Sequence, residues 1–267
     1  MAQHEPPEWA DDPLSRFLKD SEYNARAIGA NYQNVLKLLR KTYSAFESAE
    51  NAVEMDSDHK KLIPRFLLTR THSTVFAAIR LSMSGQIPES FVLLRAAIEQ
   101  SWYALHMASE PESEKRTEIW FNRNESKQEK NACRSEFSVK KIRTTHESLD
   151  PATAAQFHKL YEALIDFGAH PNQMGMLTSV KRNVDAPKDI TDYKIGILYI
   201  EEVTLMSALY HSVAVAVGAL KIFQLLYKER FALVGLDIEI NELVVALNTI
   251  FKDYAPSQEG EEGTQPN

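Results

Sequence analysis

The chain has 267 residues, of which 44% are hydrophobic and 25% are charged, and its formal net charge is −7 at pH 7. These proportions are typical of a globular protein with a substantial core, and the negative charge argues against a general DNA-binding surface. The single cysteine, Cys133, excludes an internal disulfide framework and a thiolate metal cluster. Nine glycines are few for turn-rich all-β or doubly wound folds, so the composition favours an all-α fold.

The N-terminal segment, MAQHEPPEWADDP, carries acidic residues and prolines where a secretory signal would carry a basic and then an apolar stretch. Together with the lone cysteine, this predicts a cytoplasmic protein. We expect a mobile arm over 1–13, a single helical domain over 14–254 and a disordered tail over 255–267, because the tail has nothing to bury.

Apolar periodicity predicts a first long helix over 14–53 and a second over about 59–84, which Gly85 ends. A third helix should begin with Pro88 in its first turn and run to about Ser109.

A shorter helix is expected from Pro111 through Phe121, followed by a charged stretch over 122–147 that forms a solvated helix or an excursion from the bundle. The helical pattern restarts at Asp150-Pro151 and continues to Gly168.

The interval 172–193 has little periodicity and predicts a loop, with a short hairpin around 178–183. Helices over 195–227 and 239–254 complete a bundle of about six or seven helices.

Residues 203–220 carry no formal charge over eighteen positions, which is the lower limit for a membrane span. The segment contains polar residues such as His211 and lacks aromatic and basic belts on both sides. We therefore expect a core helix or a dimer-interface helix, and no membrane association. Its apolar surplus predicts a homodimer.

The third predicted helix carries the first candidate site. Arg95 and Glu99 lie one turn apart, one position round from a core-facing stripe formed by Phe91, Leu94, Ile98, Trp102 and Leu105. Both charged side chains should be partly buried, as an ion pair that fixes helix register or as the floor of a site. Tyr103 and His106 follow on the same helix, and Arg80 on the preceding helix is a candidate partner.

A second group, Glu162, Asp166 and His170, repeats every fourth residue and shares one helix face. A metal site in a bundle usually needs Glu-x-x-His spacing, which this chain lacks, so no metal and no cofactor are expected. His170 lies beside Pro171 at a helix break, where its side chain can be aimed inward.

A third pair, Arg65 and His72, fits the loose Arg-x4-6-His signature of HEPN-type ribonucleases. The pair lies in an early helix and Phe66 follows the arginine, whereas that family places the pair late and follows the arginine with a polar residue. A surface arginine and an interhelical histidine are the simpler interpretation.

The order of the segments LLRAAIEQSWYALHMASEPESEKRTEIWF, LYEALIDFGAHPNQMGML and a long apolar helix resembles a family of uncharacterised bacterial all-helical proteins. Arg95 and Glu99 match its Arg-x3-Glu motif, and Tyr161, His170 and Pro171 match its second motif. Asp166 stands where the family commonly has serine. The resemblance implies a helical bundle with a polar cluster of Arg95, Glu99 and His170, and it implies no activity.

These observations favour a non-catalytic scaffold or small-ligand-binding protein, with a small ligand or another protein as its partner. The alternative, which rests on a looser likeness to HEPN bundles, is an endoribonuclease of a bacterial phage-defence or toxin system that acts on RNA.

Overall fold

The computed structural model describes residues 10–54, 58, 61–110, 114–169, 175, 180–185, 190–198, 200–252 and 254. Most of the predicted arm, the whole predicted tail, His170 and Pro171 lie outside the described residues. The α-helices are α1 (Pro13–Asn31), α2 (Gln33–Val53), α3 (Leu62–Ser84), α4 (Ile87–Ala108), α5 (Lys115–Phe121), α6 (Lys127–Glu136), α7 (Val139–Leu149), α8 (Pro151–Leu164), α10 (Glu202–Leu226), α11 (Lys228–Leu233) and α12 (Leu236–Ile250). They are joined by a 3-10 turn, η2 (Asn122–Asn124), a π-helix, η3 (Ile165–Ala169), and the strands β1 (Val180–Asp185) and β2 (Ile190–Ile195).

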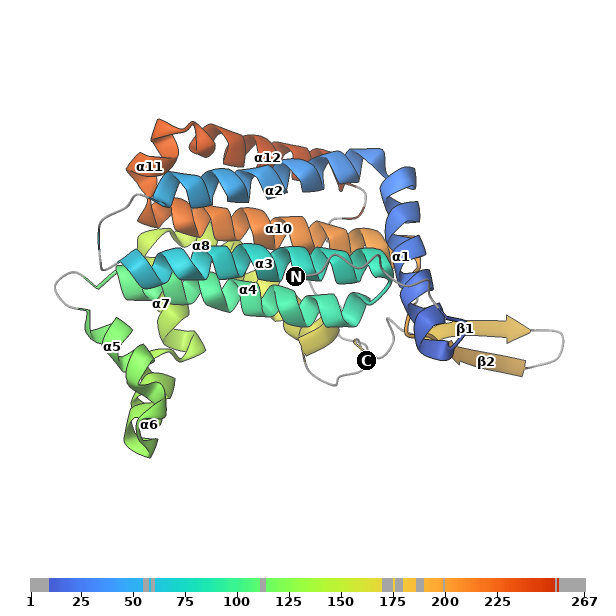
Figure 1. Ribbon diagram of the computed structural model, residues 1–267, viewed down its shortest axis with the longest axis horizontal. Coiled ribbons are helices and arrows are strands. Elements are labelled where there is room, and N and C mark those ends of the chain that lie inside the picture. The colour runs from blue at the N-terminus through green and yellow to red at the C-terminus, as the bar shows by residue number, and fades with distance from the viewer. Residues whose placement is uncertain are drawn as a thin grey trace, which may run out of the picture.

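The prediction of a helical fold is confirmed, but the count of six or seven helices is too low for the described chain. α10 lies at the centre of the bundle and packs against α2, α3, α4, α8 and α12 (Figure 1). Among the described residues, α10 is the one helix that is long and apolar enough to cross a membrane. In the folded chain, 72% of its most apolar 18-residue window is buried. The neighbouring helices of the same chain therefore cover the surface that predicted a dimer.

The predicted first helix is two helices, because the backbone breaks at Tyr32, where φ is −116° and ψ is 62°. Gly29 and Asn31, which have low helix propensity, precede the break. α2 continues along the bundle beside α12, whereas α1 turns across its end and packs on α3 (Figure 1).

Gly85 ends α3 as predicted. Its φ of 95° lies in the left-handed region that glycine adopts without strain. The next helix, α4, starts at once with a proline in its first turn, and α3 and α4 make the most extensive helix pair in the described chain.

The charged stretch over 122–147 forms two helices where one stretch was predicted. α6 buries only Cys133 and projects with α5 away from the bundle (Figure 1). α7 packs against α4 and α8 through Ile142 and His146, so its few apolar positions are enough to bring it back to the core.

Asp150 caps α8 by accepting a hydrogen bond from the Thr153 backbone N–H at 3.2 Å. The α-helix ends at Leu164 and continues as the π-helix η3, where the sequence predicted a regular helix to Gly168. A Cβ on Gly168 would lie 2.5 Å from the backbone oxygen of Pro88. Close packing of η3 on α4 therefore depends on this glycine.

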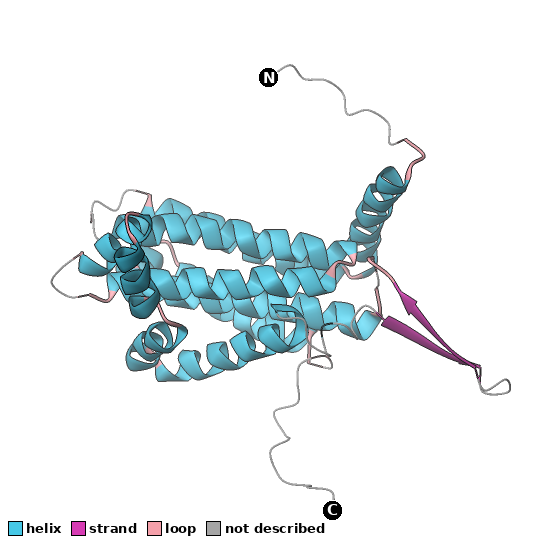
Figure 2. Cartoon of the chain, turned by 90° about the horizontal axis from the view of Figure 1, so that it is seen from below, coloured by secondary structure: helices cyan, strands magenta, loops and turns pink. Residues whose placement is uncertain are grey.

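A hairpin is present in this interval, but the predicted place at 178–183 is wrong, because residues 180–183 lie within one strand. β1 pairs antiparallel with β2 from Val180–Ile195 to Asp185–Ile190. The hairpin projects from one end of the molecule (Figure 2). Residues 190–193, predicted as loop, belong to a strand, and α10 begins at Glu202 instead of Ile195.

Candidate functional site

Arg95 and Glu99 meet Tyr161 of α8 in a closed hydrogen-bonded triangle. The Arg95 Nε donates to Glu99 Oε1 at 3.0 Å and to the Tyr161 hydroxyl at 3.2 Å, and that hydroxyl donates to Glu99 Oε1 at 2.8 Å. The α4 stripe that positions the pair is buried as predicted. The three side chains, here called the Arg95 cluster, tie α4 to α8.

Tyr161 keeps its proton throughout the physiological pH range. Burial, reinforced by its hydrogen bond to the Glu99 carboxylate, raises the pKa of the Tyr161 phenol to about 12. The hydroxyl therefore remains a hydrogen-bond donor to Glu99.

Arg143 of α7 extends the Arg95 cluster on its far side. Its guanidinium lies 4.6 Å from the ring centroid of Tyr161 and 5.6 Å from that of Trp102, and it donates a hydrogen bond to Glu162. Two arginines are thus matched by two glutamates. This network of described side chains holds α4, α7 and α8 together.

Trp102 connects the Arg95 cluster to two histidines. Its indole Nε1–H donates to His146 Nδ1 at 3.0 Å, so this ring nitrogen is an acceptor. Burial lowers the pKa of His146 to about 4, and burial followed by the nearby Arg143 charge lowers the pKa of His158. Both imidazoles are therefore neutral at pH 7.

The other predicted residues, Tyr103, His106 and Arg80, lie outside the hydrogen-bonded triangle of Arg95, Glu99 and Tyr161. The Tyr103 hydroxyl donates to the Phe137 carbonyl at 3.4 Å. His106 is buried and lies 2.7 Å from Thr145 Oγ1 and 3.2 Å from Glu136 Oε1. Arg80, the partner predicted for Glu99, is exposed.

The Arg65–His72 pair of the ribonuclease interpretation makes separate contacts. Arg65 donates to the carbonyl of Glu54 at 2.8 Å. His72 is buried, stacks on Phe46 with ring centroids 4.9 Å apart, and lies 3.1 Å from the Glu50 carboxylate. These contacts anchor α3 on α2.

The acidic stripe of the second predicted group is divided by the change of helix type. Glu162 lies in α8 and bonds Arg143, and Asp166 lies exposed in η3. Within the described ranges no group of three or more histidine, cysteine, aspartate or glutamate side chains is arranged to hold a metal ion.

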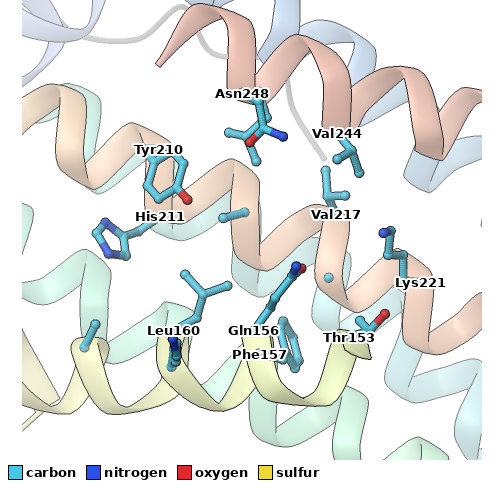
Figure 3. Close-up of a pocket in the computed structure, with 15 residues that line it drawn as sticks. Thr153, Gln156, Phe157, Leu160, Tyr210, His211, Val217, Lys221, Val244 and Asn248 are labelled. Carbon is cyan, nitrogen blue, oxygen red and sulfur yellow. The ribbon is translucent and has the colours of Figure 1, made fainter. Parts of the chain in front are cut away.

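A cavity of about 420 Å³ lies on the other side of α8, between α8, α10 and α12. Its walls are apolar, formed by Phe157 and Leu160 of α8, Val217 of α10 and Val244 of α12 among others (Figure 3). Such a volume is within the range of small-molecule sites, and apolar walls with a few polar groups are their usual lining.

Polar groups lie at both ends of the cavity (Figure 3), and Gln156 and Asn248, which are exposed, line it between them. Tyr210 and His211 of α10 are at one end, and Lys221 and Thr153 are at the other. Because Tyr210 and Lys221 belong to one helix and stand eleven residues apart in the sequence, the ends are about 16 Å apart along the axis of α10.

Phe157 separates the cavity from the Arg95 cluster. Its ring meets Trp102 edge-on, with centroids 5.7 Å apart, and a Cβ on Gly218 of α10 would lie 2.4 Å from the same ring. One face of α8 thus carries Tyr161 toward α4, and another carries a wall of the cavity toward α10.

The sequence did not predict this cavity. One feature of the sequence could have indicated it: His211 is a polar residue inside an otherwise apolar helix segment. Comparisons with protein-family models, with curated proteins and with solved structures find no match to this chain.

Proposed function

We propose that the protein is a non-catalytic small-ligand-binding bundle whose ligand occupies the cavity between α8, α10 and α12. The observation that carries this proposal is the cavity itself, of about 420 Å³, with apolar walls and polar ends. The Arg95 cluster supports the function indirectly, because it fixes α8, which forms one wall.

The ribonuclease alternative requires an arginine and a histidine that face one phosphate in an accessible cleft. The contacts of Arg65 and His72 with Glu54 and Glu50 give that alternative no support from this pair. The ligand-binding proposal is therefore the better supported of the two.

The test uses a neutral apolar fluorophore, N-phenyl-1-naphthylamine, titrated with the full-length protein. We expect saturable fluorescence enhancement with the wild type and a loss of affinity of about tenfold or more in Ala214→Phe, which places a ring in the cavity. Ala163→Phe fills the same space from α8 and should act alike.

The matched control is Ala232→Phe, which adds the same ring at an exposed position of α11. Circular dichroism verifies that each variant is folded. The proposal is wrong if the wild type does not bind the fluorophore, or if both filled variants, folded, bind it as tightly as the control.

A further inference from the structure

The ionisable groups that line the cavity are unusual for this chain. They are Lys159, Lys221, Tyr210 and His211, with no aspartate or glutamate, although the chain has 37 acidic and 30 basic residues. Apolar walls strengthen the field of a charge beside them, because the local dielectric constant is low. The cavity is therefore positively charged inside an acidic protein.

One carboxylate lies near Lys221. Asp150 caps α8. Burial opposes the lowering of its pKa, but its hydrogen bonds with Thr153, His146 where it is protonated at acid pH, and the charge of Lys221 lower it. Asp150 does not line the cavity. Two lysines against one carboxylate outside the lining leave a net positive charge for a ligand.

The opposite end is neutral and polar. His211 Nδ1 lies 2.7 Å from the Ser207 carbonyl oxygen, which only accepts hydrogen bonds, so Nδ1 carries the proton and Nε2 is the acceptor. Burial lowers the pKa of His211 and raises that of Tyr210. Both rings remain uncharged at pH 7, and the Tyr210 hydroxyl is directed toward the cavity (Figure 3).

Between the two ends most of the wall is apolar, and the polar residues Gln156 and Asn248 of the lining are exposed. Ala214 and Val217 contribute from α10, Leu160 from α8, and Val244 and Leu247 from α12. A ligand that satisfies this lining is elongated, apolar along its length and negatively charged at one end.

We infer that the ligand is an elongated apolar carboxylic acid, with its carboxylate at Lys221 and its chain between α8, α10 and α12. This inference rests on the proposed function, since it assigns a chemical class to the ligand of the same cavity. The carboxylate pairs with the ammonium of Lys221, and the apolar chain loses its contact with water between the helices.

The probes are decanoate, decan-1-ol and decylamine, which share one chain and differ in their head groups. Each is titrated as a competitor of N-phenyl-1-naphthylamine. We expect decanoate to bind about tenfold more tightly than decan-1-ol, because one charge-assisted hydrogen bond is worth about that ratio, and decylamine to bind most weakly.

Lys221→Gln removes the charge and keeps most of the side-chain length. It should weaken decanoate binding about tenfold and leave decan-1-ol binding unchanged, whereas Lys228→Gln on the exposed surface of α11 should change neither. Lys159→Gln measures how much the second lysine contributes to the affinity for decanoate.

Two failures are distinguishable. If the neutral fluorophore binds but decan-1-ol or decylamine competes as well as decanoate, the carboxylate inference is wrong and the ligand-binding proposal stands. The same holds if neither Lys221→Gln nor Lys159→Gln changes the preference for decanoate. If the fluorophore itself does not bind, the proposed function is wrong.

Discussion

At the scale of single residues, the hydroxyl of Tyr161 defines the polar network. It bonds both members of an ion pair that lies 62 residues or more away in the sequence. The side chains of Arg95 and Glu99 are 26% and 33% exposed, so solvent screens their attraction in part. Their exposure is intermediate. A surface ion pair contributes almost nothing to the free energy of unfolding, whereas disruption of a buried pair lowers it strongly.

A double-mutant cycle measures this intermediate case. Arg95→Met, Glu99→Gln and the double variant should give a coupling energy of about 1 kcal/mol in chemical denaturation, since each residue loses its partner while water replaces part of the interaction. Additive effects would show that the two residues are energetically independent. A coupling of about 3 kcal/mol or more would show that the pair behaves as fully buried.

His146 adds a pH-dependent contribution to stability. Its folded-state pKa of about 4 lies below the ordinary value of 6.5, so on acidification the unfolded chain takes up the proton first. The stabilisation is complete above pH 6.5 and is lost as the pH falls from 6.5 toward 4, by an amount on the order of 3 kcal/mol.

The check is urea unfolding of the wild type and His146→Asn at pH 7 and pH 4.5. Asparagine keeps an acceptor for the Trp102 indole but does not titrate. We expect the unfolding free energy of the variant to fall less than that of the wild type over this interval. Equal losses would contradict the lowered pKa, because the other histidines are the same in both proteins.

At the scale of elements, α8 is positioned by contacts on two faces. Tyr161 joins it to α4, and Phe157 fits between Trp102 of α4 and the bare backbone of Gly218 in α10. A glycine inside a helix is costly for the helix itself. Here it admits an aromatic ring between α8 and α10.

Gly218→Ala should therefore destabilise the protein by about 1 to 3 kcal/mol, because the new methyl group displaces the Phe157 ring. Gly29→Ala in α1 is the matched control, since its Cβ would meet only Leu36 at 3.7 Å. Higher helix propensity should make this variant neutral or more stable by about 0.5 kcal/mol. Thermal unfolding compares the two, and a fully stable Gly218→Ala would refute the packing argument.

At the scale of the whole molecule, the homodimer remains a prediction, but its surface moves from α10 to the face of α2 and α12. A groove of about 680 Å³ runs between these helices, with Lys37 and Lys41 on one wall and Glu242 on the other. Ile238 and Val245 beside it are 63% and 66% exposed. They stand seven residues apart, so in an antiparallel second copy each would face the other.

We expect light scattering at tens of micromolar protein to give a dimer mass, and Val245→Glu to give a monomer, because a carboxylate buried in the apolar contact is costly. The control is Val203→Glu, at a valine that is 63% exposed at the start of α10. A monomeric wild type would refute the dimer, and a dimeric Val245→Glu would place its interface elsewhere.

The sequence alone determined the helical fold, the burial of the α4 stripe, the end of α3 at Gly85 and the partial burial of Arg95 and Glu99. These features depend on spacing within one helix, where the 3.6-residue period sets which side chains share a face. The break at Tyr32 and the division of the charged stretch into α6 and α7 were missed, because no proline marks either point and packing against distant helices decides where each helix stops.

Only the tertiary structure brought Tyr161 to Arg95, the Trp102 indole to His146, and Lys221 and Tyr210 to the two ends of one cavity. Each of these pairings depends on which helices lie side by side, and that choice sums many apolar contacts along the whole chain. The cavity is the space that α8, α10 and α12 leave between them. A property of three surfaces at once has no local pattern in the sequence.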